Sequence, residues 1–297
     1  MSSSPLNKCV LAVVDEAGEH GLLRRLTPRR DEKFGLLCAL LLPAEHIDAI
    51  RADIRPLYDD FVRAAPANAK LHITDAFLPH YREWGLVATR VRRELFDYML
   101  ERGLYLTYAA RRCAVARATH GLSEGFIQRA MENHPANLRR HRRVPAGRFE
   151  DLLMAHFALR LDSFAHDYKR ETVLLAFDEI DQKITAGYLD VIEQARNFGK
   201  PMPGGGDAAR SPPKYQLTFS VEGTGADMLS ASRLGGLQVY GKCDPLVFAA
   251  DVVANSLHRH LAMLAADAPL NVASSVARWV LEPVTWGVIE HSVADYI

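Results

Sequence analysis

The sequence predicts an α/β protein whose mixed β-sheet is flanked by helices on both faces. Short runs rich in Val and Leu indicate buried strands, and longer segments between them have the three- and four-residue apolar spacing of helices. The first strands follow one another closely, whereas the later ones alternate with helices, which favours a sheet of mixed strand direction. We expect residues 1–297 to form a single domain, with a helical insertion at about 122–167.

The first two strands are predicted near the N-terminus. Residues 9–14 are apolar and run directly into two carboxylates, and residues 34–42 form a second apolar run that Pro43 closes. A polar, basic loop over residues 20–33 joins the two runs, so we expect an antiparallel pair. Both runs are too short to span a bilayer.

The rest of the chain alternates between helical and strand patterns. Residues 70–77 alternate briefly and indicate a strand or an extended loop, and the end of the chain is predicted as a helix followed by an apolar tail. The predicted helices are residues 44–64, 86–102, 122–167, 183–198 and 244–265, and the predicted further strands are residues 104–115, 172–177, 215–221 and 237–240.

Composition restricts the class of protein. Lys plus Arg and Asp plus Glu both number 36, so the whole protein has no net attraction for nucleic acid, and binding to a polyanion needs a local basic patch. The four cysteines are far apart, and two of them lie inside apolar runs, which indicates reduced thiols and a cytoplasmic protein. We find no signal-peptide or membrane-span pattern and expect no membrane partner.

Three carboxylates interrupt segments that are otherwise apolar. Asp15 ends the first strand, Asp178 ends the strand at 172–177, and Asp251 lies within an apolar helix. Burial of an unpaired carboxylate is costly, so each needs a partner. If the two strands are parallel, their carboxyl ends meet at one edge of the sheet, where α/β proteins bind ligands.

A cation relieves the repulsion between gathered carboxylates, and ligand sets made only of oxygen select Mg²⁺ or Mn²⁺. Two such ions, about 4 Å apart, are a known device for activating water and stabilising a leaving oxygen in phosphodiester cleavage. The predicted metal ligands are Asp15, Asp178 and Asp251.

Local geometry ranks the other acidic residues. Asp15 and Glu16 point to opposite faces of an extended strand, so both reach one metal only if the chain turns at residues 17–18. We therefore rank Asp15 as the bridging ligand and Glu16 second. Asp181 either returns towards the site or caps the helix that follows. Asp251 taken alone could equally cap or hydrogen-bond a neighbouring loop.

Two histidines and one further aspartate are accessory candidates. His72 and Asp75 are candidates for an additional ligand or a proton carrier, although His72 could equally be a strand histidine with its hydrogen bonds satisfied. His258 lies seven residues after Asp251 and shares its helix face with Asn255.

A basic run provides candidate phosphate contacts. Its arginines could bind a nucleic-acid backbone, or they could form a solvated helix end or loop. The run consists of Arg139, Arg140, Arg142 and Arg143, and secondary candidates are Arg90, Arg92, Arg93, Arg111 and Arg112.

The acidic motifs, taken in order, resemble the domain of unknown function 3800 family, which itself resembles the RNase H-like superfamily of nucleases and integrases. The resemblance covers residues 9–262 except the helical insertion. It departs at Ala17, where that family usually has Ser, and at residues 247–250, where it usually has Leu-Gln-Leu-Ala. The motifs are Asp15-Glu16-Ala17-Gly18, Leu71-His72-Ile73-Thr74-Asp75, Phe177-Asp178-Glu179-Ile180-Asp181 and Ala249-Ala250-Asp251. The resemblance implies an RNase H-like fold and a metal site more directly than it implies a substrate.

The expected function is a nuclease that hydrolyses phosphodiester bonds of RNA or DNA with Mg²⁺ or Mn²⁺. The expected catalytic residues are Asp15, Glu16, Asp178 and Asp251. The alternative is a non-catalytic adaptor that binds nucleic acid or protein on the same scaffold, in a mobile-element or phage-defence system. A hydrolase with another substrate is a third reading, and the sequence leaves monomer and homodimer open.

Overall fold

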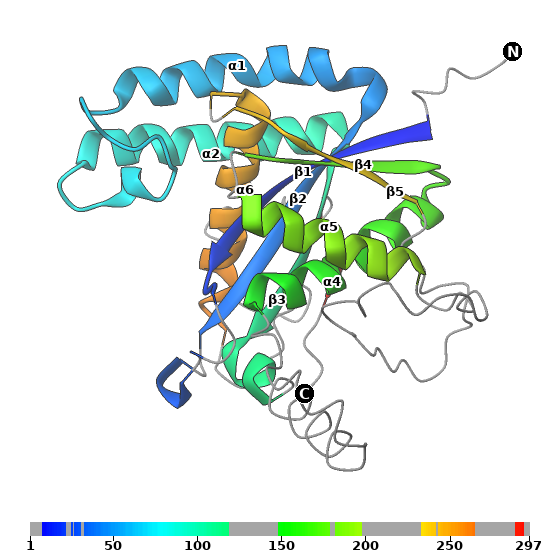
Figure 1. Cartoon of the computed structure of the whole chain (residues 1–297). Coiled ribbons are helices and arrows are strands. Elements are labelled where there is room, and N and C mark those ends of the chain that lie inside the picture. Colours follow the sequence, from blue (N-terminus) through cyan, green and yellow to red (C-terminus); the bar gives the residue numbers. More distant parts are fainter. Residues whose placement is uncertain are drawn as a thin grey trace, which may run out of the picture.

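The computed structural model describes residues 8–21, 25, 27–30, 33–118, 148–178, 182–197, 233–241, 243–264 and 289–293. This part of the chain contains a six-stranded sheet with the order β5-β4-β1-β2-β3-β6. The strands are β1 (Cys9–Gly18), β2 (Phe34–Pro43), β3 (Tyr105–Arg112), β4 (Thr172–Phe177), β5 (Leu234–Val239) and β6 (Ile289–Val293). The sheet crosses the molecule between two groups of helices (Figure 1).

Strand directions are mixed, as the sequence predicts. β1 pairs antiparallel with β2 on one side and parallel with β4 on the other, and β2 pairs antiparallel with β3. The pairs of β4 with β5 and of β3 with β6 are parallel. The apolar residues of β1, Val10–Val14, are at most 3% exposed because both faces of the central strands are covered.

Helices cover both faces of the sheet. On one face α6 packs against β1 and β2, with α1 and α2 next to it in the same core; α4 and α5 lie on the opposite face (Figure 1). The α/β architecture predicted from the sequence is therefore confirmed. The helices are α1 (Ile47–Ala64), α2 (Arg82–Arg102), α4 (Phe149–Asp167), α5 (Gln182–Asn197) and α6 (Pro245–Leu261), and the short 3₁₀ helices are η3 (Pro28–Arg30), η4 (Ala44–His46) and η5 (Asp75–Phe77).

Helix α4 belongs to the block that the sequence suggests as an insertion. Its residues Phe149, Phe157 and Leu161 are fully buried and share a core with Ala12 of β1 and Leu37 of β2. α4 is thus a layer of the domain core. The preceding residues 119–147 lie outside the described residues.

Of the two alternatives predicted for residues 70–77, the strand does not form: residues 70–72 are irregular, and a turn at residues 73–74 leads into η5. Ile73 and Ala76 of this segment are buried in the core. Near the C-terminus, β6 adds a parallel edge strand to β3 where an apolar tail was expected. The expected strand at 215–221 lies outside the described residues. In the described ranges, no helix combines the length and apolar character that crossing a membrane requires.

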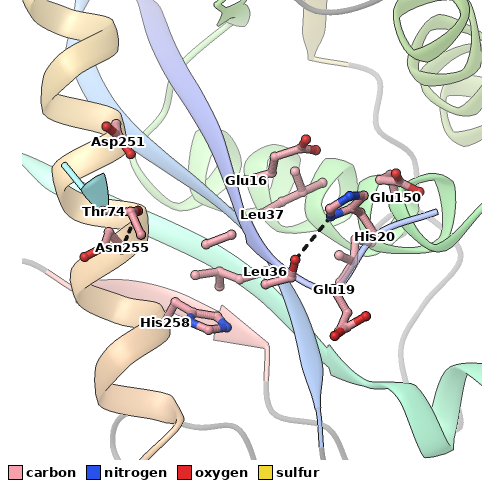
Figure 2. Close-up of a pocket in the computed structure, with 13 residues that line it drawn as sticks. Glu16, Glu19, His20, Leu36, Leu37, Thr74, Glu150, Asp251, Asn255 and His258 are labelled. Carbon is pink, nitrogen blue, oxygen red and sulfur yellow. Dashed lines mark hydrogen bonds between the residues drawn. The ribbon is translucent and has the colours of Figure 1, made fainter. Parts of the chain in front are cut away.

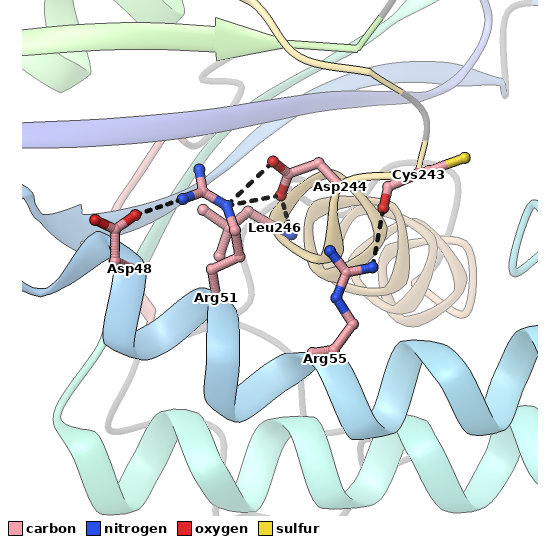
Figure 3. Close-up of polar contacts among 6 residues, drawn as sticks. All are labelled: Asp48, Arg51, Arg55, Cys243, Asp244 and Leu246. Carbon is pink, nitrogen blue, oxygen red and sulfur yellow. Dashed lines mark hydrogen bonds and ion pairs between the residues drawn. The ribbon is translucent and has the colours of Figure 1, made fainter.

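The start of α6 is fixed by a cap and two arginines. The Asp244 carboxylate accepts the backbone N–H of Leu246 at 2.8 Å, and Pro245 occupies the first helical position. Arg51 of α1 pairs with Asp244 at 3.1 Å, and Arg55 donates to the carbonyl of Cys243 (Figure 3). These contacts fix the helix that presents Asp251.

Candidate functional site

The structure brings the three predicted metal ligands to one cavity. Asp15, Asp178 and Asp251 all line a cavity of about 250 Å³, together with His72 and Glu16. They come from β1, from the residue directly after β4, and from α6. The cavity therefore lies at the carboxyl ends of two parallel strands, where α/β proteins place ligands.

The position of the cavity follows from the unequal lengths of two strands. The pairing of β1 with β4 ends at Val13 and Ala176, whereas β1 continues to Gly18. Beyond this point, among the described strands, β1 is paired only with β2. The open edge of β1 leaves room beside Asp15, and Asp178 stands at the end of the shorter strand.

The Asp15 carboxyl is in an unfavourable place for a negative charge. Burial raises its pKa well above the usual range, and the charges of Asp251 and Asp178 raise it further. A hydrogen bond with the backbone of Glu16 acts in the opposite direction. Asp15 keeps some exposed surface, so a ligand can reach it from the cavity.

Asp251 is held by the segment before η5. Its Oδ2 accepts the backbone N–H of Ile73 at 2.8 Å and lies 3.9 Å from Nδ1 of His72. Burial raises the pKa of Asp251 to about 6, and the charges of Asp178 and Asp75 add to the rise. The hydrogen bond from Ile73 and the neighbouring His72 oppose it. Asp251 thus hydrogen-bonds a neighbouring segment and also faces the cavity.

Glu16 lies on the opposite face of the sheet from Asp15. Its Oε2 accepts the hydroxyl hydrogen of Tyr188 on α5 at 3.3 Å. Burial, followed by the charge of Glu150, raises the pKa of Glu16. No turn at residues 17–18 brings the two carboxylates together, since β1 runs through Gly18. Glu16 still lines the Asp15 cavity because the edge of β1 is open there.

A second cavity adjoins the first. It has a volume of about 350 Å³ and shares Glu16, Leu37, Thr74 and Asp251 with the cavity at Asp15. In Figure 2, α6 presents Asp251, Asn255 and His258 on one side, and Glu16, His20 and Glu150 lie across from it. The two cavities form a continuous, largely acidic groove along the end of β1.

Of the accessory candidates, His72 and His258 line the groove, whereas Asp75 lies outside its lining. His72 lines the Asp15 cavity and its side chain is 51% exposed, so it can exchange protons with solvent. Asp75 begins η5, and it affects Asp251 through its charge. His258 lines the second cavity and stacks on Phe34 with ring centroids 4.6 Å apart. Burial lowers the pKa of His258, which favours the neutral ring.

Two buried carboxylates of α4 were missed in the sequence. Glu150 is 3% exposed; its Oε1 accepts the backbone N–H of Gly21 and pairs with Arg148, whereas its Oε2 has no hydrogen-bond partner among the described residues. Asp151 is 7% exposed, and burial raises its pKa to about 6. Consecutive acids in the first turn of a helix are common on exposed surfaces too, so the sequence pattern does not indicate that these two are buried.

The donor atoms at this site are of the chemical type that a hard divalent cation prefers. Carboxylate oxygens supply the site, and the pKa values of Asp15 and Asp251 are raised first by burial and then by the charges of neighbouring carboxylates, which a cation would offset. In the described part of the chain, however, no three His, Cys, Asp or Glu side chains are close enough to enclose a metal ion. The three aspartates share a cavity without forming a closed ligand shell.

Several predicted residues cannot be placed. Asp181 and the basic run of Arg139, Arg140, Arg142 and Arg143 lie outside the described residues. Among the secondary arginines, Arg92 is 2% exposed and donates to Asn255, so it is a buried residue and its assignment as a phosphate contact was wrong. Arg90 pairs with Asp60 at 2.9 Å, and Arg93 is exposed on α2.

The chain was also compared with known proteins. Comparison with protein-family models gave no match. Comparisons with curated proteins and with solved structures gave none either. The resemblance to the domain of unknown function 3800 family therefore stays a prediction from the acidic motifs, and the geometry of the groove is the main guide to function.

Proposed function

We propose that this protein is a divalent-metal-dependent nuclease that hydrolyses phosphodiester bonds of RNA or DNA on an RNase H-like fold. One observation supports this most strongly: Asp15, Asp178 and Asp251, from three separate elements, line one cavity at the end of the central strand. Burial raises the pKa values of Asp15 and Asp251, and the charge of Asp178 adds to the rise at both positions.

The sheet supports the fold assignment in outline. It is mixed, its central strand β1 carries the first carboxylate, and helices cover both of its faces. These are the features that the sequence resemblance implies for an RNase H-like domain.

The residues divide the work as follows. Asp15, Asp178 and Asp251 would hold Mg²⁺ or Mn²⁺, which supplies an activated water and stabilises charge on the phosphate oxygens. The Ile73 N–H orients the Asp251 carboxylate, leaving its Oδ1 to face a ligand. His72, near Asp251 and open to solvent, can carry a proton between the cavity and bulk water.

Glu16 reaches the site from the other face of the sheet. Its carboxylate is oriented by the hydroxyl of Tyr188 and lines both cavities. We assign it an assisting role outside the ligand set of Asp15, because the two carboxylates lie on opposite faces of β1. The four cysteines are free thiols, which agrees with a cytoplasmic location as part of this proposal.

The test is a cleavage assay on labelled single- and double-stranded RNA and DNA with Mg²⁺ or Mn²⁺. We expect wild type to cleave at least one substrate, D251N to lose the activity, and D97N, which changes an exposed aspartate on α2, to keep it. Equal cleavage by wild type and D251N, or cleavage that persists in EDTA, would contradict the proposal.

A second candidate is a non-catalytic adaptor that binds nucleic acid or protein. It is favoured by the lack of a closed ligand shell within the described residues. Thermal melting separates the two functions, because a ligand that binds only the folded state raises the melting temperature. A Mn²⁺-dependent rise together with cleavage supports the nuclease, whereas nucleic-acid binding without either supports the adaptor.

A further inference from the structure

A network of side chains fastens the segment of residues 72–77 to α6. Asn255 lies one helical turn after Asp251 and donates its side-chain amide to Oγ1 of Thr74 at 3.0 Å. Asp251 accepts the N–H of Ile73, so two consecutive residues of the segment are bound to two positions on one helix face. The groove side of α6 and this segment are therefore joined by hydrogen bonds at two adjacent positions.

The network ends in a buried arginine of α2. Arg92 donates from Nη2 to the side-chain oxygen of Asn255 at 2.9 Å, although it is only 2% exposed. Its Nε has no hydrogen-bond partner among the described residues. Burial lowers the pKa of Arg92 to about 10, so the guanidinium stays charged near neutral pH. In the described part of the chain, the hydrogen-bond partner of this buried charge is a neutral amide, and burial of a charge on such terms is costly.

A second contact ties the same segment to Arg92. Its guanidinium lies 4.6 Å from the ring centroid of Phe77, and that of Arg259 on α6 lies 4.1 Å from the same ring. Each arrangement is a favourable cation–π contact. The positive charges of Arg92 and Arg259 repel each other, and their shared contact with the Phe77 ring offsets this repulsion. Both ends of the 72–77 segment are thus fixed against α6.

We propose that Arg92 is a positioning residue for the acidic groove: through Asn255 and Phe77 it fixes residues 72–77 against α6 and so holds Asp251 in the orientation that a divalent cation requires. The contact between Arg92 and Asn255 does not touch the cavity at Asp15, and Arg92 acts through other residues. The inference rests on the proposed function for the cation, while the fastening of the segment can be measured without one.

A positioning role and a purely electrostatic role of Arg92 predict opposite changes in Mn²⁺ affinity when its charge is removed. Arg92 and Asp251 attract each other, so removal of the positive charge strengthens the pull of the groove on a cation. An electrostatic role therefore predicts tighter Mn²⁺ binding in R92M. A positioning role predicts weaker binding, because residues that orient metal ligands typically contribute 10- to 100-fold in affinity.

The first experiment measures amide hydrogen exchange in the metal-free protein. We expect R92M to speed exchange of the Ile73 amide at least tenfold while amides in the middle of α1 stay protected. R93M, the same substitution at the neighbouring exposed arginine, should change neither. N255A, which removes the Asn255 side chain and leaves Arg92 in place, should reproduce the effect at Ile73. Unchanged exchange at Ile73 in R92M, or a uniform rise throughout α1 and α2, would overturn the proposal.

The second experiment measures Mn²⁺ affinity by calorimetry in the same variants. We expect about 10- to 100-fold weaker binding in R92M and N255A, with R93M equal to wild type. R92K keeps the charge but loses the planar fork, so it should also bind more weakly. Tighter or unchanged binding in R92M would refute the positioning role. If wild type binds no Mn²⁺, the proposed function fails, and exchange at Ile73 still decides whether Arg92 fixes the segment.

Discussion

Asp15 of β1 and Asp251 of α6 face one cavity, and the negative charge of Asp251 raises the pKa of Asp15. Burial and the charges of neighbouring carboxylates disfavour ionisation of both side chains, so their negative charges lower the stability of the metal-free protein. A cation or a neutral side chain would remove this effect. This relationship leads to the first of four predictions.

Replacement of Asp251 by asparagine should stabilise the metal-free protein and abolish its response to metal. The pKa of Asp251 is raised to about 6, so at pH 7.5 its ionised form opposes folding by roughly 1–3 kcal/mol. Asn keeps an oxygen that accepts the Ile73 N–H. Melting in EDTA and in Mn²⁺ tests this: D251N should melt higher in EDTA and show no Mn²⁺ shift, while D97N behaves as wild type. A lower melting temperature for D251N in EDTA would contradict the prediction.

Asp151 should make stability depend on pH in a definite direction. Its folded-state pKa is about 6, above the ordinary value of 3.8, so the folded protein binds the extra proton between these values. Stability from this group is therefore greatest below about pH 4 and falls as the pH rises through 6. Urea unfolding at pH 7.5 should show D151N more stable than wild type by roughly 1–3 kcal/mol. The difference should shrink as the pH approaches 4, and a difference that is constant with pH would refute this cause.

Gly18 should tolerate no side chain. Its φ is +86°, and an added Cβ would lie 2.4 Å from the carbonyl oxygen of Phe34 and 2.7 Å from Nε2 of His258. Gly103 is the matched control, because it also has a positive φ, +60°, but a Cβ there meets open space. We expect G103A to cost about 1 kcal/mol from backbone strain alone and G18A to cost at least about 2 kcal/mol more. Chemical denaturation measures both, and equal losses would mean that the close approach of His258 is easily relieved.

Removal of the cap of α6 should weaken the site as well as the fold. Asp244 caps the helix and pairs with Arg51, so D244A loses both contacts and should cost about 1–2 kcal/mol or more. D244N keeps a capping oxygen and loses only the charge, so it should lie between D244A and wild type. Urea denaturation compares the free energies of unfolding of the two variants. Equal losses in D244N and D244A would show that the ion pair contributes more to stability than the cap.

The strands were predictable because their apolar runs are unambiguous. Residues 9–14, 34–42 and 172–177 are short, continuous and bounded by polar or proline residues, and all three became strands. The alternation of strand side chains also placed Asp15 and Glu16 on opposite faces without coordinates. Boundaries were less certain: β1 extends four residues past Val14 because its pairing with β2 continues to Gly18.

The missed features depend on contacts between distant segments. The sequence of α2 contains several arginines, so Arg92 resembled a surface residue. Adjacent residues point in different directions around a helix, and Arg92 is buried whereas Arg93 is exposed. Tyr188 and Glu150 showed no pattern that linked them to Glu16. The open edge of β1 depends on where β4 stops relative to β1, which is a matter of register, and sequence periodicity does not determine register between strands so far apart.

The parallel pairing of residues 9–13 with residues 172–176 determines when the groove can form during synthesis. β1, β2 and β3 can associate early, since each follows the last along the chain, but β4 and α6 leave the ribosome much later. Until then the β4-facing edge of β1 is unpaired and open to wrong partners. A cation that needs Asp15, Asp178 and Asp251 together cannot guide these early steps. Such a cation would bind only after the domain has folded. Metal supply would therefore lower the unfolding rate and leave the folding rate unchanged.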